Sequence, residues 1–406
     1  MEVKSVETLH VALIGFGTVG KGIYESIEEQ REQLESLLDK KVSIDAILIK
    51  DGDLEREVDN KLMLTTNVED LLSLPQLDVV FEAIIGVEPA RTYLAKFIEK
   101  GCHVVTANKE LLAHKGKELR SLATKHKVGL RYEAAVAASI PILSTLREGL
   151  KSNQIQEING ILNGTSNFIL SELQREGISF KQALNEAKEK GYAEADPTND
   201  IEGWDAFYKI LILSDIVYGE QPEWERIIRK GINEVTSADI KKAEALGFRI
   251  KHIASLTSTV DGPVISVEPV AVTSSHPFFH ITGVNNALQV SGNLAGSITL
   301  NGPGAGAYPT ASAMIEDLLS LYRNSSEGVF YSRSQENKSE VDDWLLLGDI
   351  PEGLMIELLP LSEKDAYYAS GKRSDIESYL EQKPFIKLYP IKGPIEKSDI
   401  SNLALV

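Results

Sequence analysis

Apolar runs of strand length alternate with amphipathic stretches of helix length over the first third of the chain. Residues 9–15 form a short, almost wholly apolar run that ends at a glycine, which is typical of a buried parallel strand. The alternation continues with predicted strands over 42–49, 77–83 and 103–106 and predicted helices over 18–40, 68–74, 89–100 and 109–126. Strands and helices that alternate at this spacing predict a parallel sheet with helices on both faces.

The pattern changes after about Pro141, where an amphipathic helix is predicted to run through Gly149. Further predicted strands cover 155–162, 264–272 and 288–300, and further predicted helices cover 167–177, 180–191 and 203–218. A glycine-rich turn at 301–306 leads into a predicted helix over 309–322, a polar stretch follows, and the tail contains a strand-like run over 354–361 and a helix over 374–381. This mixture predicts an α+β domain with a small module after it.

Charge and cysteine content narrow the class of partner. Acidic residues outnumber basic ones by 60 to 42, a formal charge of −18, and this balance argues against a surface for nucleic acid or anionic membranes. Cys102 is the single cysteine and has no intramolecular disulfide partner. No apolar run reaches the roughly 18 residues of a membrane span, and the first residues do not resemble a secretory leader. We therefore expect a cytoplasmic protein that acts on a small molecule.

A G-x-G-x-x-G motif lies between the first predicted strand and the first predicted helix. Its first glycine permits a tight turn, the second lets the backbone approach a pyrophosphate, and the third allows close packing of helix on strand. The motif predicts a dinucleotide site, although a purely structural turn remains an alternative because glycine is common in strained turns. The candidate residues are Gly15, Phe16, Gly17, Thr18, Val19 and Gly20.

The end of the second predicted strand bears on the choice between NAD and NADP. An acidic residue there favours a ribose diol, and a basic residue favours a 2′-phosphate. This chain has Lys50 followed by Asp51, so both cofactors remain open, and Lys50 gives a modest expectation of NADP. Either residue is also compatible with a solvated charge at a strand end.

Two lysines are candidates for chemistry. Lys109 follows the predicted strand over 103–106, at the edge of the sheet where ligands bind, although an exposed lysine is common there. Asp205 and Lys209 stand one helical turn apart in the densest polar cluster, 191–209, and project from one face. Such a pair, beside a carboxylate in the preceding loop, can bind an ammonium group and present a proton donor to a reacting oxygen. An exposed ion pair is the alternative.

Four segments, in this order, resemble the homoserine dehydrogenase family. They are VVTANK ending at Lys109, ILNGTSNFIL over 161–170, GYAEADPTNDIEGWDAFYK ending at Lys209 and GPGAG over 302–306, and the similarity covers about 9–322. The resemblance implies an oxidoreductase that interconverts L-aspartate 4-semialdehyde and L-homoserine with NAD(P)H, in threonine, methionine and isoleucine biosynthesis. It also implies a homodimer.

The resemblance assigns roles to individual positions. Lys209 matches the proton-donating lysine, and Lys109 matches a second lysine near the reacting oxygen and the nicotinamide. The residues that match the binding of the substrate's amino group are Glu194 and Asp205, with Asp200 as a supporting carboxylate. Gly191 and Gly306 match backbone positions that line the cofactor. The positions that match a monovalent-cation (sodium) site are Glu133, Val136, Ala138 and Ile140.

The implied fold is α/β with several parts. A NAD(P)-binding Rossmann-like parallel-sheet domain covers 1–141, and an α+β substrate-binding catalytic and dimerisation domain covers 142–301. The chain returns to the nucleotide-binding domain over 302–323, and a linker over 324–341 leads to a divergent C-terminal module over 342–406.

This chain departs from the family at two places. Residues 135–141 read AVAASIP where the family usually reads AVGGGIP, so added Cβ atoms at Ala137, Ala138 and Ser139 bear on substrate fit and sodium binding. The tail resembles a ligand-binding domain of the ACT type only faintly, with Glu352 inserted before the glycine of its turn, and we expect a degenerate module with little threonine inhibition. A paralogous dehydrogenase for another amino-acid-derived carbonyl and a non-catalytic dinucleotide sensor are the alternatives.

Overall fold

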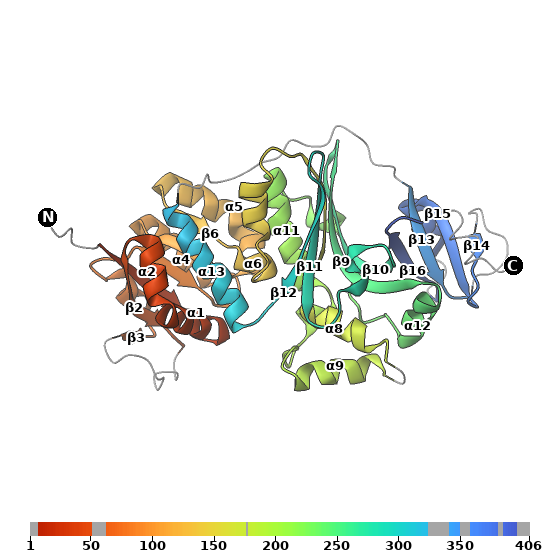
Figure 1. The fold of residues 1–406 in the computed structure, drawn as a ribbon, viewed down its shortest axis with the longest axis horizontal. Helices are drawn as coiled ribbons and strands as arrows, with labels where there is room; N and C mark the ends of the chain where they lie inside the picture. The colour runs from red at the N-terminus through yellow and green to blue at the C-terminus, as the bar shows by residue number, and fades with distance from the viewer. Residues whose placement is uncertain are drawn as a thin grey trace. The chain divides into compact units, whose positions relative to one another are not determined.

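The computed structural model describes residues 7–50, 62–175, 178–323, 341–349, 358–380 and 385–395. The chain divides into two compact units, and each is described by itself (Figure 1). The first unit comprises Met1–Ser152, Tyr208–Glu220 and Gly302–Tyr331, and the second comprises Asn153–Phe207, Gln221–Asn301 and Ser332–Val406.

The first unit contains a six-stranded sheet in the order β3-β2-β1-β4-β5-β6, in which every paired neighbour is parallel. Its strands are β1 (Thr8–Ile14), β2 (Lys41–Leu48), β3 (Met63–Thr65), β4 (Val79–Glu82), β5 (His103–Thr106) and β6 (Leu130–Arg131). The helices between them are α1 (Thr18–Glu29), α2 (Arg31–Leu38), α3 (Val68–Leu72), α4 (Ala90–Lys100) and α5 (Lys109–His126). The predicted parallel sheet is confirmed. The amphipathic stretch over 18–40 forms two helices, α1 and α2, because the backbone leaves the helical region at Gln30.

A distant segment completes the core of this unit. Helix α13 (Ala307–Tyr322), cyan in Figure 1, packs along α1, and its Met314 and Leu318 are buried in the same apolar cluster as Ile23 and Ile27. The two helices approach closely because Gly22 has no side chain: a Cβ there would lie 2.8 Å from the carbonyl oxygen of Ala307. The start of α13 therefore lies beside the first turns of α1.

After β6 the chain forms a compact series of short helical segments. These are α6 (Ala134–Ala137), α7 (Ile142–Ser144) and a π-helical turn, η1 (Thr145–Gly149). The apolar residues of this series are almost completely buried, so the helix predicted to run through Gly149 exists but ends in a π turn.

The second unit contains a ten-stranded sheet in the order β12-β11-β7-β9-β10-β16-β13-β15-β14, with β8 also paired to β10. Its first strands are β7 (Ile155–Ile161), β8 (Ile228–Arg229), β9 (Phe248–Thr259), β10 (Gly262–Thr273), β11 (Asn285–Gly292) and β12 (Gly296–Pro303). Its helices are α8 (Gly164–Glu172), α9 (Phe180–Glu189), α10 (Thr198–Ile201), α11 (Trp204–Tyr218), whose later part belongs to the first unit, and α12 (Ser237–Ala245). The short 3₁₀ turns are η2 (Trp224–Arg226) and η3 (Pro277–His280).

Strand β9 was not predicted from the sequence, although it lies in the middle of the sheet. Its apolar pattern is broken by Lys251 and His252, and both are buried, 1% and 3% exposed. The Lys251 ammonium donates to the carbonyl oxygen of Ile281 at 2.5 Å. The Nε2 atom of the His252 ring lies 2.9 Å from the carbonyl oxygen of Lys230. Partners that are distant in sequence therefore make burial of two polar side chains possible.

The C-terminal strands join this sheet. They are β13 (Val341–Leu347), β14 (Leu358–Pro360), β15 (Ala366–Lys372) and β16 (Lys387–Lys392), with helix α14 (Arg373–Leu380). Strand β16 pairs in parallel with β10, and Arg373 forms an ion pair with the buried Glu268 of β10. Of the strand expected over 354–361, residues 358–360 form β14, and 354–357 lie outside the described residues. Glu352 and the linker apart from Val341 also lie outside them. No helix among the described residues is long and apolar enough to cross a membrane.

Candidate active site

The glycine motif has the geometry that a dinucleotide requires. Gly15 has a φ of +95°, and a Cβ there would lie 2.8 Å from the carbonyl oxygen of Ala83. A Cβ on Gly20 would lie 2.1 Å from the carbonyl oxygen of Gly15, whereas one on Gly17 would have nothing within 4 Å. Close packing therefore excludes a side chain at the first and third glycines, whereas the second faces open space. This matches the division of roles among the glycines of dinucleotide-binding loops.

The loop lies where the strand order reverses. The sheet turns from β1 toward β2 on one side and toward β4 on the other, and ligands of open α/β sheets bind outside the carboxyl ends of the strands at such a point. Gly17 begins α1 without a side-chain cap. Thr18 is exposed and Val19 half-buried, whereas the Phe16 side chain is buried and packs edge-on against Tyr24, so Phe16 offers a ligand only its backbone.

Two other predicted cofactor residues lie near this loop. Lys50 is exposed just beyond β2, whose Leu48 carbonyl oxygen accepts the Gly15 N–H at 2.9 Å. Gly306 is the first residue before α13, the helix that packs along α1. Asp51 lies outside the described residues. Gly191 lies in the second unit, exposed on the loop after α9.

Lys109 is the first residue of α5 and is half-buried. Asn108 caps this helix by accepting the Leu111 N–H at 3.0 Å, and it donates through Nδ2 to the Gly86 carbonyl oxygen at 2.8 Å. The loops that follow β4 and β5 are thereby joined at the carboxyl edge of the sheet.

Asp205 and Lys209 lie one turn apart on α11 and are both buried, 5% and 7% exposed. The alternative of a solvated surface ion pair is therefore wrong. The helix begins after a sharp turn at Gly203, which has a φ of +82° and would place a Cβ 3.1 Å from Cε1 of His252. Burial lowers the pKa of His252 to about 4, so the imidazole beneath this turn is neutral at physiological pH.

Asn163 connects two of the predicted substrate carboxylates. Its Nδ2 donates to Asp200 Oδ1 at 2.7 Å and to Asp205 Oδ2 at 2.9 Å, while its Oδ1 accepts the Ser166 N–H at 2.7 Å and caps α8. Glu194 is exposed on the loop before α10, and no hydrogen bond of the described residues joins it to this network. The sequence analysis missed Asn163 as a functional residue, although it lies within the ILNGTSNFIL segment.

The predicted cation residues surround the turn after β6. Glu133 is buried, and its carboxylate accepts the N–H groups of Leu143 at 2.6 Å and Ser144 at 2.7 Å. Burial raises the pKa of Glu133 despite these hydrogen bonds. The Ile140 carbonyl oxygen accepts the Ile142 N–H at 2.8 Å, and Val136 is fully buried. Ala138 has a φ of +46°, a region that favours glycine, so the departure from the family's glycines is strained here.

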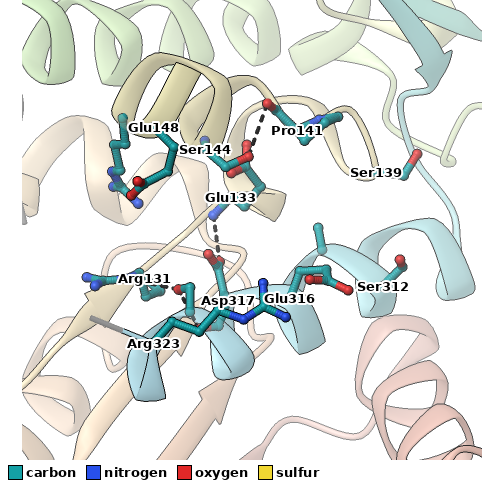
Figure 2. A pocket seen from close by; sticks show the side chains of 13 residues that line it. Arg131, Glu133, Ser139, Pro141, Ser144, Glu148, Ser312, Glu316, Asp317 and Arg323 are labelled. Carbon is teal, nitrogen blue, oxygen red and sulfur yellow. Dashed lines mark hydrogen bonds between the residues drawn. The ribbon is translucent and has the colours of Figure 1, made fainter. Parts of the chain in front are cut away.

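Glu133 also lines a cavity of about 580 Å³ within the first unit. Figure 2 shows Asp317, on α13, next to Glu133 in the lining of this cavity, and its carboxylate accepts the Glu133 N–H at 2.7 Å. Burial, and next the charge of Glu133, raise the pKa of Asp317 to about 8, and the positive charges of Arg147 and Arg131 oppose this shift. Among the described residues there is no group of three or more His, Cys, Asp or Glu side chains suited to a metal ion.

The glycine loop at the switch point and the buried acid and lysine of α11 define a nicotinamide-dinucleotide-dependent oxidoreductase. Residues 15–133 match the family model for the NAD-binding domain of homoserine dehydrogenase, and residues 141–319 match that for homoserine dehydrogenase. The chain belongs to the homoserine dehydrogenase family. The family resemblance and the oxidoreductase activity expected from the sequence are confirmed, and the paralogue and sensor alternatives lose their support.

Individual relatives agree. The homoserine dehydrogenase of Lactococcus lactis subsp. lactis is 38% identical over 324 residues, which are 79% of this chain and 76% of the relative. That of Neisseria gonorrhoeae is 40% identical over 78% of this chain and 73% of its own. The crystal structure of a homoserine dehydrogenase from Thiobacillus denitrificans superposes with a TM-score of 0.87 at 31% identity and covers 96% of this chain and 99% of its own. A hyperthermophilic archaeal homoserine dehydrogenase in complex with NADPH superposes with a TM-score of 0.67 at 28% identity, over 78% and 99% of the two chains.

Proposed function

We propose that this enzyme reduces L-aspartate 4-semialdehyde to L-homoserine with Lys209 as the proton donor. A bound nicotinamide supplies the hydride. As negative charge develops on the carbonyl oxygen, the Lys209 ammonium stabilises it and then transfers a proton to it. The observation that carries this role is the burial of Lys209 one turn from Asp205. Removing a lysine and a carboxylate from water costs free energy, so such a buried pair favours a functional role. Lys109 is the second lysine near the reacting oxygen.

The acidic residues hold the substrate's ammonium group in this proposal. The roles of Asp205 and Asp200 are supported because Asn163 already holds both carboxylates in place. Little side-chain entropy is therefore lost when the ammonium group binds. Glu194, on its exposed loop, supplies a third carboxylate.

For the cofactor we propose NADP in preference to NAD. The glycine loop fits the pyrophosphate, since Gly17 opens onto free space at the start of α1. In this proposal the exposed Lys50, just beyond β2, pairs with the 2′-phosphate. Gly191 and Gly306 are proposed to line the cofactor through their backbones.

A monovalent cation such as sodium is proposed to bind between Glu133 and backbone carbonyls of Val136, Ala138 and Ile140. The donors are all oxygen atoms, which hard cations prefer. A cation would also stabilise the ionised form of Glu133, which burial disfavours. Thermal unfolding in sodium chloride compared with choline chloride tests this: sodium should raise the unfolding temperature, and equal values would exclude the site.

A homodimer is proposed through the edge strand β12. This strand ends the described sheet, and it is largely exposed along its length, with Ile298 and Leu300 only half-buried. An exposed edge is a template for pairing with a second copy. Light scattering gives the mass in solution, and a mass of one chain would exclude the dimer.

The decisive assay follows nicotinamide absorbance with aspartate semialdehyde and with other small aldehydes. The proposal expects the semialdehyde to have the highest kcat/KM. A faster reaction with an aldehyde that lacks the amino group would contradict the roles of the acidic residues.

A further inference from the structure

We propose that Glu82 is a positioning residue of the hydride-transfer site, holding the loops that lead to Ile85 and Lys109 in the geometry that the reaction needs. The inference rests on the proposed role of Lys109. Glu82 is the last residue of β4 and is completely buried. It pairs in register with Ile14, the last residue of β1 before the glycine loop. It therefore lies at the reversal of strand order, directly beneath the proposed nicotinamide site.

Glu82 organises both neighbouring loops. Its Oε1 accepts the Ile84 N–H at 2.8 Å, which fixes the loop after β4. Its Oε2 accepts the hydroxyl proton of Thr106, the last residue of β5. Thr106 Oγ1 in turn accepts the Asn108 N–H at 3.0 Å. The hydrogen bonds of one carboxylate thus hold two loops at the edge of the sheet.

The network continues to the residues that would face the ligands. The Asn108 side chain caps α5, whose first residue is Lys109, and also donates to the Gly86 carbonyl oxygen. Ile85, between these contacts, is 85% exposed although it is a large apolar residue at the edge of the sheet. An exposed isoleucine side chain beside a rigid polar network offers an apolar surface against which the face of a planar ring can pack.

Burying a carboxyl group costs free energy, which is unfavourable for a residue with a purely structural role. Burial raises the pKa of Glu82 to about 7, opposed by the hydrogen bonds from Thr106, Ile84 and Asn108. The ionised form accepts all of these hydrogen bonds, at Oε1 from Ile84 and Asn108 and at Oε2 from Thr106. Protonation of Oε2 would reverse the hydrogen bond with the Thr106 hydroxyl, so the proposal expects the geometry of the loop after β5 to change with pH near neutrality.

Within the described part of the chain, Glu82 forms no ion pair. The ionisable side chains on the contacting segments are His10 on β1, His103 on β5, Lys109 and Glu110 on α5, and Glu88 after β4. None is among the causes of the Glu82 pKa shift. His10 contacts Asp45, and His103 Nδ1 accepts the Gly129 N–H at 2.7 Å.

The substitution Glu82→Gln tests the proposal, because glutamine keeps the volume and removes the ionisation. We expect kcat to fall by about 10- to 100-fold, the effect of a small misplacement of reacting groups. The unfolding temperature should not fall, since a neutral amide is cheaper to bury. The parent's kcat should rise with pH through about 7, and Glu82→Gln should lack this rise.

Three further variants complete the experiment. Thr106→Val cuts the link from Glu82 to Asn108 and should lower kcat. Glu268→Gln changes another buried carboxyl, on β10, and should leave the pH profile unchanged. Lys109→Ala tests the proposed function separately.

The outcomes are distinguishable. A Glu82→Gln enzyme with a lowered unfolding temperature but the parental kcat and pH profile would show a structural residue only and overturn the inference. If Lys109→Ala is impaired while Glu82→Gln is not, the role of Lys109 stands and the inference fails. Parental kcat in Lys109→Ala would instead remove Lys109 from the mechanism, and with it the link proposed here.

Discussion

The side-chain amide of Asn163 lies 2.9 Å from Oδ2 of Asp205 and donates to it. The same nitrogen donates to Asp200, so one amide at the start of α8 holds two carboxylates from different helices. In the proposed mechanism these carboxylates bind the substrate's ammonium group, which makes Asn163 the centre of the substrate site.

We expect Asn163→Ala to lower kcat/KM for homoserine by about 10- to 100-fold, because both carboxylates lose their common partner. Stability should also fall by about 1 kcal/mol with the lost helix cap. Steady-state kinetics and chemical unfolding measure the two effects. Ser179→Ala is the matched control: it removes the cap of α9 without touching the carboxylates. An equal loss of kcat/KM in this control would mean that Asn163 acts only as a cap.

Lys209→Ala should abolish turnover while cofactor binding stays intact. Removal of a general acid typically costs 10²–10⁴-fold in rate. Single-turnover rates and NADPH fluorescence titration separate the two properties. Lys96→Ala, on α4 with its ammonium paired to Glu69, changes a lysine outside the mechanism. A Lys209→Ala enzyme with near-parental kcat would exclude Lys209 as the proton donor.

Lys50→Ala should reduce kcat/KM for NADPH by about 10- to 100-fold, since one hydrogen bond to a charged group contributes about 1.5–3 kcal/mol. The value for NADH should stay nearly constant, because NADH carries no 2′-phosphate. Lys41→Ala, on the opposite end of β2, controls for the general loss of positive charge. If use of NADPH were unaffected by Lys50→Ala, the phosphate contact would not exist.

Because of Asp317, the free energy of unfolding should fall as the pH rises. Burial, and next the charge of Glu133, raise the pKa of its carboxyl to about 8, above the value of an unfolded chain. The folded state therefore binds one more proton than the unfolded state between about pH 4 and 8, and stability decreases over this range.

The substitution Asp317→Asn should remove this dependence and stabilise the protein at pH 8 relative to the parent. Each unit of pKa shift corresponds to about 1.4 kcal/mol, so the gain is measurable by urea unfolding. Glu316→Gln, exposed on the same helix, should leave the slope unchanged. A parental slope in Asp317→Asn would assign the dependence to other groups.

Threonine should inhibit this enzyme weakly. Strand β16 pairs with β10, and Arg373 holds Glu268, so the C-terminal strands are built into the sheet of the second unit. Titration of threonine into the assay decides the point. Strong, saturable inhibition that disappears on truncation after Asn337 would show a working sensor.

The sequence by itself determined the parallel sheet, its helices and the dinucleotide loop. These features depend on local patterns: apolar runs of strand length, helical periodicity and glycines at a fixed spacing. The family motifs likewise named Lys209, Asp205 and Lys109 as candidates, because their neighbours along the chain carry the signal.

Only the tertiary structure decided what surrounds those residues. Asn163 meets Asp200 and Asp205 across about 40 residues of sequence, and Glu82 meets Thr106 across two strands. Lys251 and His252 made β9 look unlike a buried strand, and their hydrogen-bond partners come from distant loops. Buried polar groups are stabilised by non-local partners, and no periodicity along the chain records which partner the fold brings into contact.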